Sequence, residues 1–289
     1  MKNKLLISFI SFLVFVSCTN NTNKTRALNP EVDLAVLTSD YNKWWSYQYH
    51  EIILSSDFIP LNEKAELISK GEFLKSLTSG SYVTAQMISD DELVYYKLFK
   101  LSDEAPKNIS NTIKNVSNTA YKHYKMEGAE FPEFNIKDID GNSFDNQSIK
   151  GKTTVIKTWF IACKPCIAEF PELNKLVQSY KDEDQLQFLS LATDAAPALR
   201  AFLSNKKFDY QVVSDQRDLI QEKLNLQIYP THIIVDENGI IKKVVNKASE
   251  LISYIDHRKE FKKSEGKELS PPPPPPPPPL KTKKGNQEV

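Results

Sequence analysis

The fold of this chain is decided by one stretch, residues 153–166, which reads TTVIKTWFIACKPC. Its β-prone, mostly apolar part, Thr153 to Ile161, predicts a buried strand, and the spacing of apolar residues from Ile167 to Tyr180 predicts a helix. Cys163 and Cys166 lie between them, where a helix N-terminus offers unpaired N–H groups and the positive end of its dipole. Both effects favour a thiolate and lower the pKa of the first cysteine below about 8.5. Two cysteines placed in this way suit thiol–disulfide exchange.

Composition sets wide limits on the rest of the chain. The 289 residues are enough for two domains, and 40% of them are hydrophobic, which supports an ordinary core. Lys plus Arg and Asp plus Glu number 37 each, so no excess of positive charge indicates nucleic acid. Only three cysteines are present, which is too few for a disulfide scaffold.

The N-terminus has the pattern of an export signal. Lys2 and Lys4 precede an apolar run, Leu5 to Val16, that is shorter than the about 20 residues of a membrane span. Ser17-Cys18 at its end resembles the lipobox of bacterial lipoproteins, although Phe15 stands where that signal usually has Leu. We therefore predict a signal peptide at 1–17, lipidation of Cys18 and a flexible tether at 18–29. An ordinary signal peptide cleaved elsewhere is the alternative.

Residues 30–128 predict a separate small α+β module of unknown role. Its expected elements are two helices and a hairpin of two strands: Asn62–Leu77, Pro106–Met126 ending at Gly128, Ser81–Ile88 and Leu93–Leu101. The aromatic cluster at Trp44-Trp45 is either a ligand platform or core packing, and we favour packing.

Residues 129–262 predict a domain in which strands alternate with helices around a mixed sheet. A hairpin around Asp140-Gly141 comes first, and a second hairpin turns at Glu237-Asn238-Gly239. Expected elements after the cysteines are the strands Leu186–Ala192, Tyr210–Val213, Thr231–Asp236 and Ile240–Val245, and the helices Ala196–Asn205, Asp218–Leu226 and Ala248–Phe261. Residues 263–289 are expected to form a Pro-rich disordered tail. Its nine consecutive prolines, Pro271 to Pro279, require polyproline II. We favour a spacer or a repeat expansion over a ligand for a proline-binding partner.

Several motifs of residues 127–262 together resemble the thioredoxin fold, and within it the TlpA/ResA-like periplasmic disulfide reductases of bacteria. They are Phe131-Pro132-Glu133-Phe134, Trp159, the Cys-x-x-Cys, Glu169-Phe170-Pro171 and Ile228-Tyr229-Pro230-Thr231. The resemblance implies an α/β fold, a mixed sheet flanked by helices with an N-terminal hairpin and a central insert. Leu186 to Val213 would supply that insert.

The resemblance also implies roles for individual residues. Cys163 would be the exposed nucleophile and Cys166 the buried resolving thiol, with Glu169 behind them modulating their protonation. Pro230 would be cis and would leave the polar groups of Tyr229 to an extended substrate strand. Pro171 should kink the helix, because it removes one helical hydrogen bond. Substrate contacts are then expected from Trp159, Lys164, Pro165, Tyr229 and Pro230.

Lys157 departs from the thioredoxin pattern, which has a buried aspartate at this position. A lone buried ammonium is costly. Our hypothesis is therefore that Lys157 pairs with Glu169 beneath the cysteines and tunes their pKa values. The alternative is that Lys157 reaches solvent at the sheet edge. Thr158 stands where a core Phe is common, which we attribute to packing against the N-terminal module.

The sequence thus predicts a membrane-tethered thiol–disulfide oxidoreductase of the bacterial envelope that faces the periplasm. By the resemblance, it would act as a reductant of protein disulfides, recharged by a membrane electron donor, with no cofactor and no metal. His50, His123, His232 and His257 are scattered, so each is expected to be a surface or packing residue. Two rival functions stay open: a lipoprotein adaptor with a redox-idle thioredoxin-like part, and a thiol peroxidase, disfavoured because Phe160 replaces the required Thr.

Overall fold

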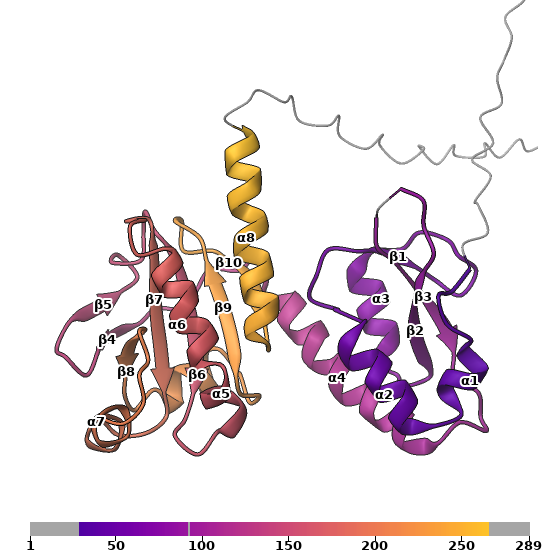
Figure 1. The fold of residues 1–289 in the computed structure, drawn as a ribbon, viewed down its shortest axis with the longest axis horizontal. Helices are drawn as coiled ribbons and strands as arrows, with labels where there is room; N and C mark the ends of the chain where they lie inside the picture. Colours follow the sequence, from indigo (N-terminus) through magenta and orange to yellow (C-terminus); the bar gives the residue numbers. More distant parts are fainter. Residues whose placement is uncertain (1–28, 92, 266–289) are drawn as a thin grey trace, which may run out of the picture.

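The computed structural model describes residues 29–91 and 93–265, with side chains described as far as His257. Figure 1 shows two parts side by side, with the long helix α4 (Lys107–Met126) running from one toward the other. The predicted signal peptide, Cys18 and the nine prolines lie outside the described residues. So do the predicted tether except Asn29 and the predicted tail except residues 263–265, which continue the last helix. No helix of the described part combines the length and the apolar character needed to cross a bilayer.

The N-terminal part packs its helices around a three-stranded sheet of order β1-β3-β2. The strands β2 and β3 form the predicted antiparallel hairpin, and β1 adds to β3 in parallel. Trp44 is fully buried in the core of this part, as predicted, together with Phe73 and Ile109. The elements besides α4 are α1 (Leu34–Thr38), α2 (Tyr41–His50), β1 (Ile59–Leu61), α3 (Lys70–Leu77), β2 (Tyr82–Met87) and β3 (Tyr95–Lys100).

One predicted helix in this part is too long. We expected it to begin at Asn62, but α3 begins only at Lys70. Asn62 caps a turn instead, because its side chain accepts hydrogen bonds from the backbone N–H groups of residues 64 and 66. Ser69 and Glu72 form a reciprocal capping box, and this pair sets the true start of the helix.

The C-terminal part is a five-stranded mixed sheet of order β10-β9-β6-β7-β8. The three strands β6, β7 and β8 run parallel, whereas β9 is antiparallel to β6 and β10 to β9. The elements are β4 (Asn135–Lys137), β5 (Ser143–Asp145), β6 (Thr153–Trp159), α5 (Lys164–Ala168), α6 (Phe170–Ser179), β7 (Leu186–Ala192), α7 (Ala196–Leu203), β8 (Gln211–Val213), β9 (Thr231–Val235), β10 (Ile241–Val245) and α8 (Ala248–Glu265).

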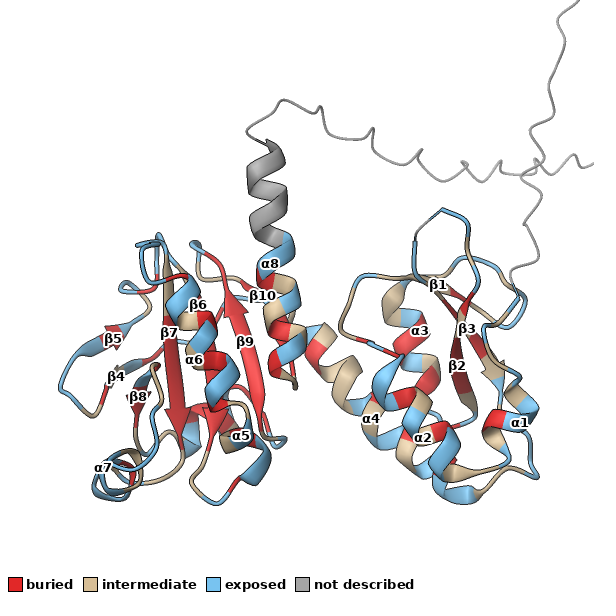
Figure 2. Cartoon of the chain, in the orientation of Figure 1, coloured by how far each residue is buried: buried red, intermediate tan, exposed pale blue. Residues whose placement is uncertain are grey.

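The central strand β6 is buried on both faces (Figure 2). Val155 belongs to the core under α6 and α8, and the next residue, Ile156, belongs to the core on the opposite face. Residues 218–226, predicted to be a helix, contain only a π-helical turn, Leu219–Lys223. The helix after the cysteines is broken at Glu169 into α5 and α6, and Pro171 lies in the first turn of α6, as its predicted kink requires.

The two parts meet at the start of β10 and at the turn into α8. Gly128 ends α4 with φ +88°, and its N–H donates to the carbonyl of Ile241 over 2.8 Å. On the other side of the junction, Ser55 donates to Glu250 over 2.7 Å, and Lys247 donates to the carbonyl of Tyr49 over 2.8 Å. These contacts fix the N-terminal part against the same edge of the sheet that carries β10.

Candidate active site

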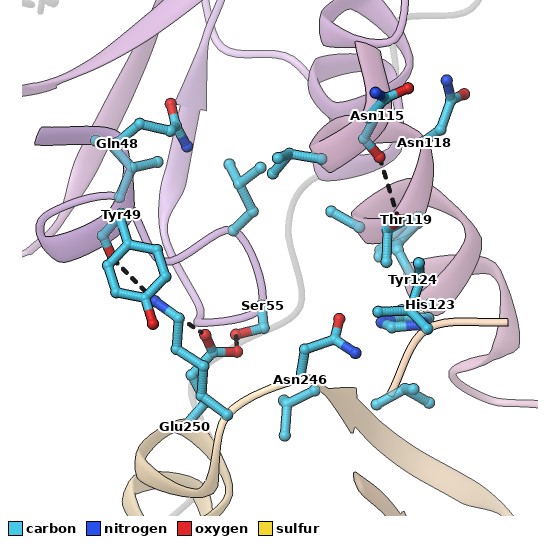
Figure 3. Close-up of a pocket in the computed structure, with 18 of the residues that line it drawn as sticks. Gln48, Tyr49, Ser55, Asn115, Asn118, Thr119, His123, Tyr124, Asn246 and Glu250 are labelled. Carbon is cyan, nitrogen blue, oxygen red and sulfur yellow. Dashed lines mark hydrogen bonds and ion pairs between the residues drawn. The ribbon is translucent and has the colours of Figure 1, made fainter. Parts of the chain in front are cut away.

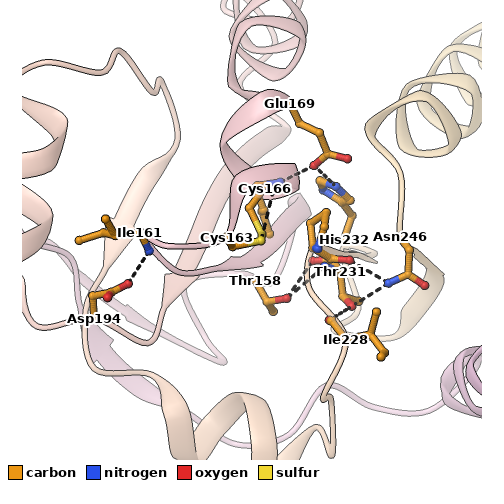
Figure 4. Close-up of a disulfide and its surroundings, with 12 residues drawn as sticks. Thr158, Ile161, Cys163, Cys166, Glu169, Asp194, Ile228, Thr231, His232 and Asn246 are labelled. Atoms are coloured by element: carbon orange, nitrogen blue, oxygen red, sulfur yellow. Dashed lines mark hydrogen bonds and ion pairs between the residues drawn. A yellow bond between two sulfur atoms is a disulfide. The ribbon is translucent and has the colours of Figure 1, made fainter.

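The two cysteines form a disulfide at the start of α5, directly after the loop that follows β6 (Figure 4). The sulfurs are 2.01 Å apart. Cys163 is the N-cap of α5, and its sulfur accepts the backbone N–H of Cys166 over 3.3 Å. A donor aimed at this sulfur stabilises a thiolate there once the disulfide is reduced.

The accessibility of the sulfurs differs less than we expected. Cys163 is 5% exposed and Cys166 is fully buried. Cys163 is therefore the accessible one of the pair, but the expectation of an exposed nucleophile is wrong for the oxidised protein. Lys164 and Pro165 are exposed beside it, as a contact surface requires.

Trp159 has no exposed surface and packs edge-on against Phe170 at 5.1 Å between ring centroids. It shares a buried cluster with both cysteines. The expectation that Trp159 contacts substrate is therefore wrong. Trp159 supports the disulfide from the interior of the protein. The loop above it is held by Asp194, whose carboxylate accepts the N–H of Ile161 over 2.8 Å.

The Tyr229–Pro230 peptide bond is cis, as the resemblance implied. Thr158 holds this loop. Its hydroxyl accepts the N–H of Thr231 and donates to the carbonyl of Thr231, each over 3.2 Å. The prediction that Thr158 packs against the N-terminal module is therefore wrong. Asn246 holds it from the other side by donating to the carbonyl of Pro230 over 2.8 Å. Pro230 itself is buried, which leaves Tyr229 as the accessible residue of the pair.

Tyr229 packs against the cluster that contains Cys163, and its ring meets Phe160 edge-on at 5.3 Å. Within the described chain, no hydrogen bond engages the backbone N–H or carbonyl of Tyr229. These two groups are therefore open to a backbone laid alongside the disulfide.

Lys157 and Glu169 form a buried ion pair, with 2.5 Å between Nζ and Oε2. Lys157 has no exposed surface and lies in the central strand, so the alternative of a sheet-edge lysine is wrong. His232 also reaches Glu169, with Nε2 3.1 Å from the same oxygen. The other oxygen accepts the N–H of Ala248 over 2.9 Å.

The geometry of the sheet explains this meeting. Lys157 in β6 and His232 in β9 are paired directly across the two antiparallel strands, so their side chains leave the same face of the sheet. Glu169 lies one helical turn after Cys166, at the break between α5 and α6. From there its carboxylate reaches both Lys157 and His232; Figure 4 shows it beside His232. His232 was expected to be a surface or packing residue; it is fully buried, and its contact with Glu169 was not predicted.

Burial alone would raise the pKa of Glu169, but the hydrogen bond from His232 and the charge of Lys157 outweigh it and lower that pKa. Burial lowers the pKa of Lys157 against the opposing attraction of Glu169, and it lowers the pKa of His232 as well. The arrangement is best described as an ammonium–carboxylate pair with a neutral imidazole. Because an ionised carboxylate only accepts, Nε2 of His232 must carry the proton.

Within residues 29–91 and 93–265, no three His, Cys, Asp or Glu side chains gather closely enough to hold a metal ion. His123 is buried in α4, in the N-terminal part. The Cys163–Cys166 disulfide supports exchange with external thiols.

The parallel strands β6, β7 and β8 are extended by an antiparallel hairpin, a disulfide lies at a helix N-terminus, and the residue before a cis-proline packs against the cluster of the two cysteines. This combination places the chain in the thioredoxin-fold class. Comparison with known proteins agrees. The Redoxin family matches residues 126–266. Thioredoxin-like protein YneN of Bacillus subtilis is 30% identical over 121 residues, which are 41% of this chain and 71% of YneN. Thiol-disulfide oxidoreductase ResA of Bacillus cereus is 27% identical over 124 residues, 42% of this chain and 71% of ResA.

Two solved structures are also similar. The thioredoxin domain of a thiol-disulfide oxidoreductase from Bacteroides vulgatus has a TM-score of 0.42 and 24% identity, over 46% of this chain and 96% of that one. A putative thioredoxin from Neisseria meningitidis has a TM-score of 0.41 and 26% identity, over 48% and 95%. The chain belongs to the TlpA/ResA-like thioredoxin-fold thiol–disulfide oxidoreductases, and residues 126–266 form its Redoxin domain.

Proposed function

We propose that this oxidoreductase reduces protein disulfides on the periplasmic side of a bacterial membrane, to which Cys18 tethers it through lipid. The observation that carries the proposal is the Cys163–Cys166 disulfide, in which Cys163 is the more accessible residue. Tyr229 packs against the same cluster, and its backbone groups have no hydrogen-bond partner among the described residues. Relatives named thiol-disulfide oxidoreductase ResA support the exchange chemistry. The lipid anchor is supported only by the sequence around Cys18.

The reaction begins from the reduced protein. The Cys163 thiolate attacks one sulfur of a substrate disulfide, the substrate S–S bond breaks, and the displaced substrate thiolate takes a proton from solvent. Cys166 then loses its proton and attacks the Cys163 sulfur, which releases the second substrate thiol and forms the disulfide seen here. Two electrons and two protons pass to the substrate, and a membrane dithiol donor must return two electrons for the next cycle.

Charge balance around the sulfurs supports the reducing direction. Strong oxidants of this fold owe their potential to a stabilised reduced form. Here the positive charge of Lys157 is matched by Glu169, and the buried His232 is neutral. In the reduced protein, the Cys163 thiolate then keeps the N–H of Cys166 as a close hydrogen-bond donor. The group of Lys157, Glu169 and His232 adds no net positive charge to stabilise that thiolate. A thiolate without that extra stabilisation favours the disulfide, so the protein gives up electrons readily.

Trapping the mixed disulfide tests the proposal. In cells that make Cys166→Ser, substrate proteins should remain linked to Cys163 and appear as dithiothreitol-sensitive adducts. The double variant Cys163→Ser/Cys166→Ser is the matched control and should give none. If Cys166→Ser traps nothing and the purified wild type does not accelerate insulin reduction by dithiothreitol, reduction of protein disulfides is the wrong function. Retained cellular function in the double variant would favour the adaptor, and consumption of peroxide would favour the peroxidase.

A further inference from the structure

A cleft of about 620 Å³ lies between the two parts of the molecule. The helices α2 and α4 form one wall, and the end of β10 with the start of α8 forms the other (Figure 3). A volume of this size falls in the range of about 300–1,000 Å³ that is usual for binding sites. The Redoxin match begins only at residue 126, so α2 and nearly all of α4 lie outside it.

The ionisable groups that line the cleft are already used by the protein. Lys247 donates to the carbonyl of Tyr49 and stacks over its ring at 3.8 Å, and Glu250 accepts from Ser55. Lys70 donates to the carbonyl of Ser56 over 2.6 Å. Glu127, the remaining charged lining residue, faces Lys243 at 3.8 Å. Two lysines and two glutamates therefore line the cleft, and these four side chains carry no net charge that would select a phosphate or a cation.

What the cleft offers instead is aromatic surface and neutral amides. Trp45, Tyr49 and Tyr124 contribute aromatic surface to it, and Asn115 and Asn118 lie exposed at its rim. No hydrogen bond inside the described residues engages the side-chain amide of either asparagine. An amide both donates and accepts, as a peptide group does, and an aromatic surface takes side chains of many kinds. This chemistry suits a polypeptide.

The cleft shares residues with the active site. Ile228, which is 48% exposed, and Asn246 both line it, and they are close neighbours of the cis-proline loop in Figure 4. Asn246 bonds the carbonyl of Pro230 and the hydroxyl of Thr231. A chain laid against the free backbone groups of Tyr229 therefore continues over Ile228 into the cleft.

We propose that the cleft binds, in extended form, the polypeptide segment that flanks the disulfide of a substrate protein. This inference rests on the proposed function and gives the N-terminal part a role in it. The proline tail is the competing occupant. The helix α8 starts at the cleft and its 18 residues carry the chain about 27 Å along its axis, so the tail would have to return over that distance.

Filling the cleft tests the inference. Thr119 is half-buried in its wall, and its hydroxyl bonds only the carbonyl of Asn115 within the described residues, so Thr119→Trp should leave α4 intact. Asn118→Trp at the rim is a second variant, should the first fail to fold. Asn111→Trp is the control, because Asn111 is exposed on the same helix outside the cleft. We measure kcat/KM of the full chain for insulin disulfides and for the small disulfide 5,5′-dithiobis(2-nitrobenzoate).

The ratio of insulin to small-disulfide kcat/KM should fall about three- to ten-fold in Thr119→Trp and in Asn118→Trp, the loss expected for one or two neutral contacts. It should stay unchanged in Asn111→Trp. An unchanged ratio in both cleft variants overturns the inference and leaves the proposed function standing. If the ratio instead rises in the cleft variants of the full chain, and this rise disappears when the chain ends at Glu265, the cleft binds the tail. That result also overturns the inference. A wild type that reduces neither disulfide refutes the proposed function itself.

Discussion

Replacing Lys157 with methionine keeps an unbranched side chain one atom shorter and removes the buried charge that faces Glu169. The 2.5 Å separation corresponds to an attraction of about 7 kcal/mol at an effective dielectric constant of about 20. Desolvation of the two ions offsets most of that attraction. Removal of one partner nevertheless leaves a buried, uncompensated carboxylate, which typically costs about 3–5 kcal/mol. Glu169 keeps its bonds to His232 and Ala248, so we expect the low end, about 3 kcal/mol.

The cost should depend on pH in a defined direction. In the wild type the pKa of Glu169 is lowered, so its carboxylate adds stability above the unfolded pKa of about 4.3 and loses it as the pH falls through the folded pKa. In Lys157→Met, burial is no longer opposed by the lysine, so we expect the pKa of Glu169 to lie higher than in the wild type, although the hydrogen bond from His232 remains. The carboxyl group then adds less stability than in the wild type, and this shortfall grows as the pH rises through about 4.3. The difference between the two proteins is therefore larger at pH 7.5 than at pH 4.5.

Urea unfolding of the oxidised proteins, followed by circular dichroism at both pH values, measures this difference. Lys152→Met is the matched control, because Lys152 is exposed just before β6. Adding Glu169→Gln to Lys157→Met should recover part of the loss. The same loss at both pH values, or additive losses in the double variant, would refute the buried pair as a source of stability. In the reduced proteins, alkylation rates against pH give the thiol pKa values, and no change in either cysteine would refute the proposed tuning.

Three further predictions concern other parts of the chain. Burial, reinforced by the charge of Lys122, lowers the pKa of His123 to about 4. As the pH falls, the unfolded chain therefore protonates His123 before the folded protein does. The free energy of unfolding should fall by up to about 3 kcal/mol between pH 6.5 and 4. Urea titrations should show that His123→Phe lacks this pH-dependent loss. Asn246→Ala removes the two hydrogen bonds to the cis-proline loop and should slow insulin reduction about ten-fold, whereas Asn238→Ala in the hairpin turn should not. Cys18→Ser should abolish labelling by radioactive palmitate and move the protein from the membrane fraction to the soluble fraction; unchanged labelling would exclude the lipobox.

Local patterns in the sequence were sufficient for most of the C-terminal part. The predicted strand Leu186–Ala192 matches β7 residue for residue, because its mostly apolar residues lie between two polar segments that end the strand. The Cys-x-x-Cys and Tyr-Pro-Thr motifs gave the disulfide and the cis peptide. The helix predicted from Asn62 failed because apolar spacing does not reveal that Asn62 satisfies a turn.

The residues that sequence reasoning missed depend on contacts between distant segments. His232 is 63 residues from Glu169, and only the register of β9 on β6 sets it opposite Lys157. A histidine in an otherwise apolar strand was the single available signal. Thr158 and Asp194 are similar cases. Thr158 holds the cis-proline loop and Asp194 holds the loop before the cysteines, and neither residue belongs to the loop that it holds. The cleft could not be predicted, because it arises from two parts that no motif relates.

Three consecutive residues at the turn from β10 into α8 connect these separate findings. Asn246 holds the carbonyl of Pro230, Lys247 bonds the carbonyl of Tyr49 in the N-terminal part, and Ala248 donates to the buried carboxylate of Glu169. Because neighbouring residues cannot move independently, the position of the N-terminal part, the loop facing the disulfide and the carboxylate behind it are fixed together. A displacement of Lys247 by a chain in the cleft would therefore be transmitted through one peptide unit to a hydrogen bond of Glu169. This is why thiol pKa values measured with and without a bound polypeptide substrate would report on the cleft as well as on the ion pair.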